Sequence, residues 1–570
     1  MIISFFLISL IILFSTLGYG YFFCRIVGLE NINKNIGLIG FLGLFFLSII
    51  SSYTHIITPH NYIFNISIII LGILFSIYNF YKYNLNILDF KNVFFIFLFF
   101  FVAIILSKNN EDYSYYHLPN AIHFAQNKLE FGLGNLNHGF KHISTLFLMM
   151  SLNYLPVFEH YLFNITNYSF YVFLITFLIF EIYKPRSHNL NFSNIFLLLL
   201  LILFLVKFSR LAEFGSDISG QIVLCLYIFF LIEFIFNKNL KFHQKDLYLK
   251  LSLLFLVFAV TLKFIHIIYS IPLFFLILIT KQKKEYLVKI IKIRYSIFIL
   301  FPIIFLIFFN FASTGCLIYP VSKTCFYHLD WSLSFETVKN LNLHYETWAK
   351  GGKGPNFEVN NPTDYVNSLN WISNWFNVYF FNKFSDFILV IISILFVTFI
   401  VFFKDIKKKT KILKKEDSIF LYFYIFISFI FITWFLNFPT LRYAGYIIIF
   451  LLIVLPFSKF LNHRINMKKK NSFKNITILI LISYSIFFVK NSSRLLDELN
   501  KSYNDHNNFK NFPFYWVENV KYDKIDINGF KVYKVNSKCW DVPTPCVRNV
   551  DSLNIKTKKG YKFYSIKNDK

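Results

Sequence analysis

Long apolar runs dominate this sequence of 570 residues and constrain its fold more than any other feature. A helix needs about 20 apolar residues to cross the ~30 Å hydrocarbon core of a bilayer, and about 14 runs qualify. They cover residues 1–22, 36–54, 62–81, 93–107, 157–183, 194–208, 217–237, 249–262, 264–279, 295–313, 386–403, 418–437, 442–459 and 475–490. With 56% hydrophobic residues, more than an ordinary soluble domain contains, the chain is predicted to be an all-α polytopic membrane protein.

The formal net charge of +27 comes from lysines and arginines that lie in short loops between the apolar runs. Seven lysines lie between residues 404 and 415, and segments 281–294 and 464–474 are also strongly basic. Loops of this kind face the cytoplasm under the positive-inside rule. The distribution therefore predicts an orientation in the membrane and argues against binding to nucleic acid.

The expected topology depends on two segments. Residues 1–22 have no basic residue ahead of them and no small-residue cleavage site behind, so we expect a retained span and not a signal peptide. The remaining spans alternate correctly only if residues 146–156 do not cross, and we expect an interfacial or half-buried helix there. The segments then placed outside are 108–143, 209–216, 314–385 and 491–570.

Two domains follow from this topology. Residues 1–490 form the multi-span domain, whose large outer loops are 108–143 and 314–385. Residues 491–570 form a polar tail with alternating stretches, such as residues 530–535, that are typical of strands. We predict a small extracytoplasmic unit that is α+β or β-rich.

The six cysteines divide into two kinds. Cys24 and Cys225 fall in or beside apolar spans, where cysteine usually serves as a packing residue. The other four form two close pairs in the outer segments, where an oxidising compartment permits disulfides. Because no histidine accompanies them at a metal-type spacing, disulfides are favoured over zinc. The pairs are Cys316 with Cys325 and Cys539 with Cys546.

Two adjacent carboxylates, Glu111 and Asp112, follow directly after an apolar span at the outer boundary. Partial desolvation at such a position raises a carboxyl pKa and favours proton transfer or metal binding. The head of a lipid-anchored substrate would lie at the same level. The alternative is that both residues are solvated and cap the next helix.

A second pair of carboxylates, Glu213 and Asp217, is spaced i, i+4 at another outer boundary. If the segment is helical, the two share one face and could bind a divalent cation or sugar hydroxyls. They could equally cap a helix. No cofactor is otherwise predicted.

Three basic or imidazole side chains are candidates for substrate contacts. Arg442 lies in a short outer cap between two spans, where a guanidinium can hold a phosphate in a bidentate way. Lys263, with His266 close by, lies between two spans at the same level, although it could simply extend to water. His117 is a candidate sugar or phosphate contact, but a histidine in an aromatic run is more often structural.

Tryptophans gather in the long loop 314–385. Residues of this type beside a membrane mark an interfacial belt, and they also stack on sugar faces. The sequence does not distinguish the two roles. The residues are Trp331, Trp348, Trp371 and Trp375.

Short motifs across residues 100–550 resemble one group of bacterial membrane proteins. EDYSYYHLPNAIHF at 111–124 and GLGNLNHGF at 132–140 are similar to the first outer loop of proteins related to the GT-C glycosyltransferase superfamily. Many members of this group are known only as hypothetical membrane proteins. Further matches in the same order are AEFGSD at 212–217, GCLIYP at 315–320, Arg442-Tyr443 before an apolar span, and CWDVPTPC at 539–546.

The resemblance implies a multi-span enzyme that moves a sugar, with inversion, from a polyprenyl-phosphate donor to a glycan or lipid acceptor. The reaction would occur at the outer face of the bacterial inner membrane, in cell-envelope glycan or lipopolysaccharide assembly. The acidic residue of the first loop would be the general base. By motif position that role comes to Asp112, with Glu111 as the alternate, because the pair here is Glu-Asp.

Two other functions remain as alternatives. A flippase or polysaccharide exporter predicts ionisable residues in mid-span and helices broken by glycine or proline. An O-antigen polymerase or ligase would use arginines in large outer loops, and these loops are poor in arginine. The charges found here concentrate at the outer boundary, which favours the transferase.

Overall fold

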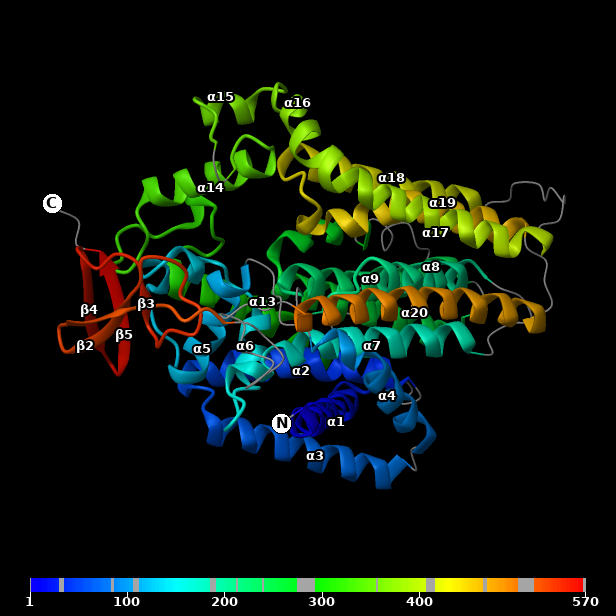
Figure 1. Ribbon diagram of the computed structural model, residues 1–570, viewed down its shortest axis with the longest axis horizontal. Helices are drawn as coiled ribbons and strands as arrows, with labels where there is room; N and C mark the ends of the chain where they lie inside the picture. Colours follow the sequence, from blue (N-terminus) through cyan, green and yellow to red (C-terminus); the bar gives the residue numbers. More distant parts are fainter. Residues whose placement is uncertain are drawn as a thin grey trace.

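The structure is a computed structural model that is mostly helical (Figure 1). It describes residues 2–29, 35–83, 87–105, 112–184, 191–211, 214–237, 240–273, 293–354, 357–405, 416–464, 469–500 and 517–566.

Most of the long helices run along the long axis of the molecule. The first half of the chain contains α1 (Ile2–Val27), α2 (Ile36–Ile57), α3 (Tyr62–Tyr83), α4 (Ile87–Phe100), α5 (Leu118–Gln126), α6 (Thr145–Ser151), α7 (Asn164–Tyr183), α8 (Phe192–Val206), α9 (Ser216–Phe236) and α10 (Phe242–Leu262). The second half contains α13 (Ile293–Thr314), α14 (Phe335–Ala349), α15 (Pro362–Asn367), α16 (Trp371–Trp375), α17 (Ser385–Phe402), α18 (Glu416–Asn437), α19 (Tyr446–Arg464) and α20 (Lys469–Asn500). Figure 1 places α14, α15 and the carboxy-terminal strands together at one end of the bundle.

Ten helices in the described part of the chain are long and apolar enough to cross a membrane, which is compatible with a multi-pass membrane protein. The expected number of about 14 is not reached. The helices at Phe90–Ala103, Phe192–Val206 and Phe264–Leu273 are apolar but short. One more of the expected runs, 249–262, does not form a separate apolar helix. It is the second part of α10, whose first turns carry Lys245 and Asp246.

Helix α8 shows how a run can be fully apolar and still fall short of the length of a membrane-spanning helix. Its 15 residues rise about 22 Å, less than the ~30 Å of a bilayer core. Residues 193–205 are all buried, and the helix packs between α7, α19 and α20. A helix that is apolar on every side belongs in the interior of the bundle.

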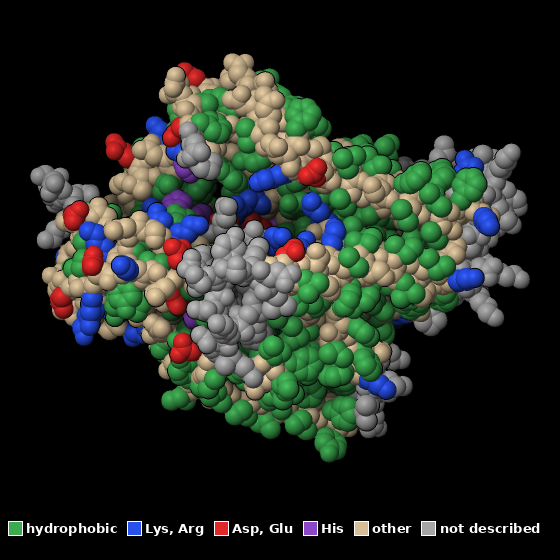
Figure 2. Space-filling view, viewed as in Figure 1, with side chains coloured by type: hydrophobic (Ala, Val, Ile, Leu, Met, Phe, Trp, Pro, Cys, Tyr) green, Lys and Arg blue, Asp and Glu red, His purple; other side chains and the backbone are tan. Residues whose placement is uncertain are grey.

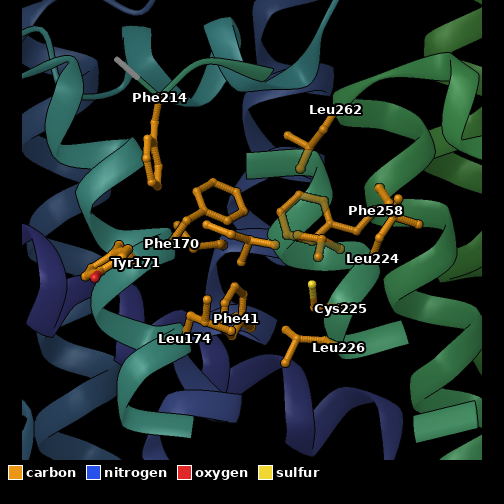
Figure 3. Close-up of a cluster of buried hydrophobic side chains, with 14 of the residues drawn as sticks. Phe41, Phe170, Tyr171, Leu174, Phe214, Leu224, Cys225, Leu226, Phe258 and Leu262 are labelled. Atoms are coloured by element: carbon orange, nitrogen blue, oxygen red, sulfur yellow. The ribbon is translucent and has the colours of Figure 1, made fainter. Parts of the chain in front are cut away.

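The core of the bundle lies where α2, α7, α9 and α10 meet (Figure 3). Phe41, Phe170 and Phe258 are fully buried there, with ring centroids 6.1 Å apart for Phe41–Phe170 and 5.6 Å apart for Phe170–Phe258. Gly37 allows α2 to approach α7 closely, because a Cβ on it would lie 2.3 Å from the backbone nitrogen of Phe177. Small residues commonly permit such contacts between membrane helices. Cys24 and Cys225 are buried and take no part in the two disulfides.

The outward faces of α3, α17 and α18 are apolar, as lipid contact requires. Ile63 is 79% exposed and Phe396 63% exposed. Apolar side chains cover much of the bundle in Figure 2, whereas charged side chains collect at the end that carries the tail.

Helix α6 differs from the expectation for residues 146–156. All seven of its residues are buried, and it packs against α2 and α5. The segment is thus buried within the protein, and its expected interfacial position in the membrane stays a prediction. The segment is nevertheless too short to cross, because seven residues rise only about 10 Å.

The carboxy-terminal tail is β-rich, as predicted. Strands β1 (Asp523–Ile527), β2 (Phe530–Lys534) and β3 (Cys546–Val547) form one sheet in that order, and β4 (Leu553–Lys558) pairs antiparallel with β5 (Tyr561–Ile566). Asn528 and Gly529 both have positive φ in the β1–β2 turn, the conformation that Asn-Gly favours in a two-residue hairpin. Before the tail, α20 continues to Asn500, past the expected boundary at residue 490.

Candidate functional site

Four charged side chains from distant parts of the sequence meet at one end of the bundle, and we call them the ionic cluster: Asp112, Asp217, Lys263 and Arg442. The Nη2 of Arg442 donates to Oδ2 of Asp112, and its Nε donates to Oδ2 of Asp217 at 2.9 Å. The Nζ of Lys263 donates to the other oxygen of Asp217. One guanidinium therefore bridges two carboxylates.

Arg442 is held by an unusual turn directly before α19. The backbone leaves helical geometry at Tyr443, and Ala444 has φ of 67°, a left-handed conformation that costs a non-glycine residue about 1 kcal/mol or more. Two indoles fix this turn. The Nε1 of Trp375 donates to Pro439 O at 2.6 Å, and the Nε1 of Trp434 donates to Thr440 O at 3.2 Å.

Asp217 and Lys263 both lie at helix ends. Asp217 is in the first turn of α9, and Lys263 is the residue that ends α10. The positive end of a helix dipole favours a carboxylate, and the negative end favours an ammonium group. Because α9 and α10 are antiparallel neighbours, the two ends bring the opposite charges together.

Asp112 directly precedes a π-helical turn at Tyr113–His117. Such turns occur often at functional sites. The hydroxyl of Tyr116 donates to Oδ2 of Asp112 at 3.3 Å. The tail supports the same turn, because the backbone N–H of Trp540 donates to Ser114 O at 3.1 Å.

The ionic cluster is partly open. The side chain of Arg442 is 33% exposed, and that of Asp112 is 27% exposed. Burial would raise the pKa of Asp112, but Arg442 and, less strongly, Lys263 outweigh burial and hold that pKa below its ordinary value. Asp112 is therefore ionised at neutral pH.

Aromatic side chains form one wall of the site. Trp348 of α14 lies 5.8 Å from the Arg442 guanidinium, measured to the ring centroid. The Nζ of Lys263 lies 4.4 Å from the ring centroid of Tyr443. Both distances are in the range of cation–π contacts. The long loop 314–385 thus reaches the ionic cluster through α14.

The remaining predicted site residues are placed as follows. His117 is 3% exposed, its ring lies 4.5 Å from that of Tyr116, and burial lowers its pKa to about 4, so it packs beside the cluster as a neutral ring. His266 is fully buried and bonds through Nδ1 to Ala259 O at 2.9 Å. Glu111 and Glu213 lie outside the described residues.

A metal site is not evident. Within the described ranges, no group of three or more His, Cys, Asp or Glu side chains could hold a metal ion. Asp217 makes ion pairs with Lys263 and Arg442, and its expected cation-binding partner Glu213 is not described.

Both close pairs of cysteines form disulfides. Cys316 is joined to Cys325 in the long outer loop, and Cys539 is joined to Cys546 in the tail. The second disulfide closes the loop that carries Trp540, whose backbone contacts Ser114.

Sequence reasoning missed a buried network that attaches the tail to the first outer loop. Glu130 is 3% exposed and lies 3.1 Å from Nε2 of His123 and 2.9 Å from Nζ of Lys562. The hydroxyl of Tyr564 donates to the same carboxylate at 2.8 Å. Nothing in the sequence around Glu130 indicates that Lys562 and Tyr564, so far along the chain, are its partners.

A family model described as "Domain of unknown function (DUF8201)" matches residues 1–449. The chain belongs to this family. All four residues of the ionic cluster fall inside the matched region, whereas most of α19, α20 and the tail lie beyond it. No curated protein and no solved structure matches the chain.

Proposed function

We propose that this protein is an inverting glycosyltransferase. It would move a sugar from a polyprenyl-phosphate donor to a glycan or lipid acceptor at the outer face of the bacterial inner membrane, in cell-envelope glycan or lipopolysaccharide assembly. The observation that carries this proposal is the meeting of Asp112, Asp217, Lys263 and Arg442 at one end of the apolar bundle.

The chemistry of such a transfer needs two kinds of group. The acceptor hydroxyl attacks the anomeric carbon as its proton passes to a base, and the bond from that carbon to the phosphate oxygen breaks. The leaving phosphate takes the bonding electron pair and needs positive charge to hold it. In the proposed site, Asp112 is the base, and Arg442 and Lys263 hold the phosphate.

The ion pairs suggest how the donor would activate the base. In the unliganded protein, Arg442 holds the pKa of Asp112 low, so this carboxylate is a weak base. A donor phosphate competes for the same guanidinium. Once Arg442 turns to the phosphate, burial dominates at Asp112 and raises its pKa, which makes it a stronger base as the acceptor arrives.

The exporter alternative is less well supported. Glu181 and Glu233 are buried acids of α7 and α9, 4% and 0% exposed. Both lie in the closing turns of their helices and not at mid-span. Charges in mid-span are the feature expected of a transport path.

Transfer can be tested with purified protein in lipid nanodiscs and a panel of radiolabelled polyprenyl-phosphate sugars. We expect wild-type protein to release polyprenyl phosphate from one donor, and Asp112→Asn to slow release by about 10³-fold, within the range that general bases contribute. Asp386→Asn is the matched control, because Asp386 is an exposed carboxylate in the first turn of α17. Full activity in Asp112→Asn, or release from no donor at all, would refute the proposal.

The proposed orientation has its own test. A reporter that is active only outside the cytoplasm should be active when it is fused within the 132–142 segment. The same reporter should be inactive when it is fused after α17. The opposite pattern would place the ionic cluster on the wrong side of the membrane for a polyprenyl-phosphate donor used at the outer face.

A further inference from the structure

A second group of basic side chains lies near the ionic cluster and is used by none of the chemistry above. It consists of Lys141, His138 and Arg548, which we call the basic group. Lys141 and His138 come from the short helical turn His138–Lys141 in the first outer loop, and Arg548 comes from the tail. The carbon at the centre of the Arg548 guanidinium lies 5.2 Å from the Tyr115 ring centroid, and that ring lies 5.9 Å from the ring of His138.

The basic group has an excess of positive charge. Lys141 and Arg548 have no carboxylate partner among the described side chains; Arg548 donates through Nε to Ser537 O at 3.0 Å. Burial lowers the pKa of His138 to about 4, and Lys141, His344 and Arg548 act in the same direction. The ionic cluster, by contrast, pairs two cations with two carboxylates.

A row of rings joins the two places. Tyr116, which contacts Arg442, lies 4.7 Å from His142, and His142 lies 5.1 Å from His138, all measured between ring centroids. The hydroxyl of Tyr345 in α14 lies 3.1 Å from Nε2 of His138, so the row continues to the long outer loop. Figure 2 shows a hollow between the α14–α16 region and the tail in which basic and histidine side chains gather.

The position of Arg548 is fixed by the way the tail docks. The side-chain amide of Asn137 donates to Cys546 O at 3.4 Å, next to the turn that carries His138. The amide of Asn127 donates to the hydroxyl of Thr544 at 2.7 Å. Arg548 follows directly after β3, so these contacts and the Cys539–Cys546 disulfide bring its side chain to Tyr115.

We propose that the basic group is a second anion subsite that binds a phosphate group of the acceptor. The identity of the ligand as the acceptor rests on the proposed function, whereas the binding of a phosphate group does not. A lysine and an arginine without carboxylate partners, beside a tyrosine hydroxyl and an imidazole, match the several acceptor oxygens of a phosphate. The substrate class that follows is a phosphorylated glycan or glycolipid acceptor, distinct from the donor phosphate at Arg442.

Phosphate binding can be measured on the full chain in nanodiscs of zwitterionic lipid, with inorganic phosphate as the probe. We expect Lys141→Gln with Arg548→Gln to weaken binding at one site by about tenfold or more, because each removes a charge-assisted contact. Lys556→Gln with Lys558→Gln is the matched control, since both are exposed lysines of β4 in the same tail. Lys141→Arg with Arg548→Lys keeps both charges and should retain binding, which separates charge from folding.

Two further arms identify the source of the phosphate. Adding phosphatidylglycerol to the nanodiscs should compete with inorganic phosphate if a lipid headgroup occupies the subsite, and should leave its affinity unchanged if the ligand is a soluble phosphorylated glycan. Asp112→Asn should lose transfer yet keep phosphate binding at the basic group, so failure of the catalytic proposal does not hide this result. Equal phosphate affinity in Lys141→Gln with Arg548→Gln and in the lysine control would overturn the inference.

Discussion

The ionic cluster and the Glu130 network use the same kinds of side chain, yet their surroundings are opposite. Glu130 is 3% exposed, and its carboxylate contacts a histidine, a lysine and a tyrosine hydroxyl. Asp112 is 27% exposed, and the arginine that binds it also binds Asp217. A buried network with several partners on one carboxylate stabilises the fold, whereas an open one with a shared cation can exchange partners with a ligand.

The burial of Glu130 predicts the largest effect on stability. Glu130→Ala leaves Lys562 and His123 without their carboxylate, and removing one partner of a buried ion pair costs about 3–5 kcal/mol. We expect a lower melting temperature and faster proteolysis of the tail. Glu358→Ala is the matched control, because Glu358 is 47% exposed and pairs only with Lys353. An equal response of the two variants would remove the distinction between buried and open networks.

Acid should loosen the same network. Burial alone would raise the pKa of Glu130, but His123 and Lys562 outweigh it and lower the pKa to about 2. Because the folded-state pKa is below that of the unfolded chain, this contribution is present above about pH 4.5 and is lost as the pH falls towards 2. Hydrogen exchange of the β4–β5 amides between pH 6 and pH 3 would report it. The dependence should vanish in Glu130→Gln.

Arg442→Lys tests whether the open cluster depends on a guanidinium. Lysine keeps the charge but cannot bridge Asp112 and Asp217 through separate nitrogens in a fixed plane. We expect the apparent KM for the polyprenyl-phosphate donor to rise about tenfold, with little change in melting temperature. An unchanged KM would remove Arg442 from the donor site.

Asp112→Asn should have the smallest effect on stability. Arg442 keeps its contact with Asp217 at 2.9 Å, and partly exposed ion pairs contribute about 0–1 kcal/mol. The melting temperature should therefore stay within the range of the Asp386→Asn control. A drop as large as that of Glu130→Ala would show that the ionic cluster is also structural.

Hydropathy predicted the helical bundle but not the number of spans. Runs 93–107 and 194–208 are as apolar as the ten long helices but form shorter helices, because the interior of a bundle and the lipid around it favour the same side chains. The position of α8 between α7, α19 and α20 depends on tertiary packing, which periodicity does not encode. The β-rich tail was recognisable because alternation of polar and apolar residues is a local signal.

The site was partly predictable for a similar reason. Asp112, Asp217, Lys263 and Arg442 were singled out because a charge at the end of an apolar run is conspicuous, although their mutual pairing needed the fold. Glu130, Lys141 and Arg548 lie in stretches that are polar anyway, so nothing marked them. Their partners are set by how the tail docks, a contact between the two ends of the sequence.

The backbone of Phe131 pairs with Lys562 and Tyr564 in the last hairpin, and Tyr564 reaches Glu130 across 434 positions of sequence. A ribosome feeding this chain into the bilayer delivers the 108–143 loop long before the hairpin that contacts it. The loop that carries Asp112 therefore lacks these contacts until the hairpin has been made. Products truncated before the hairpin would therefore lack this support for the loop that carries Asp112, even when every span is inserted.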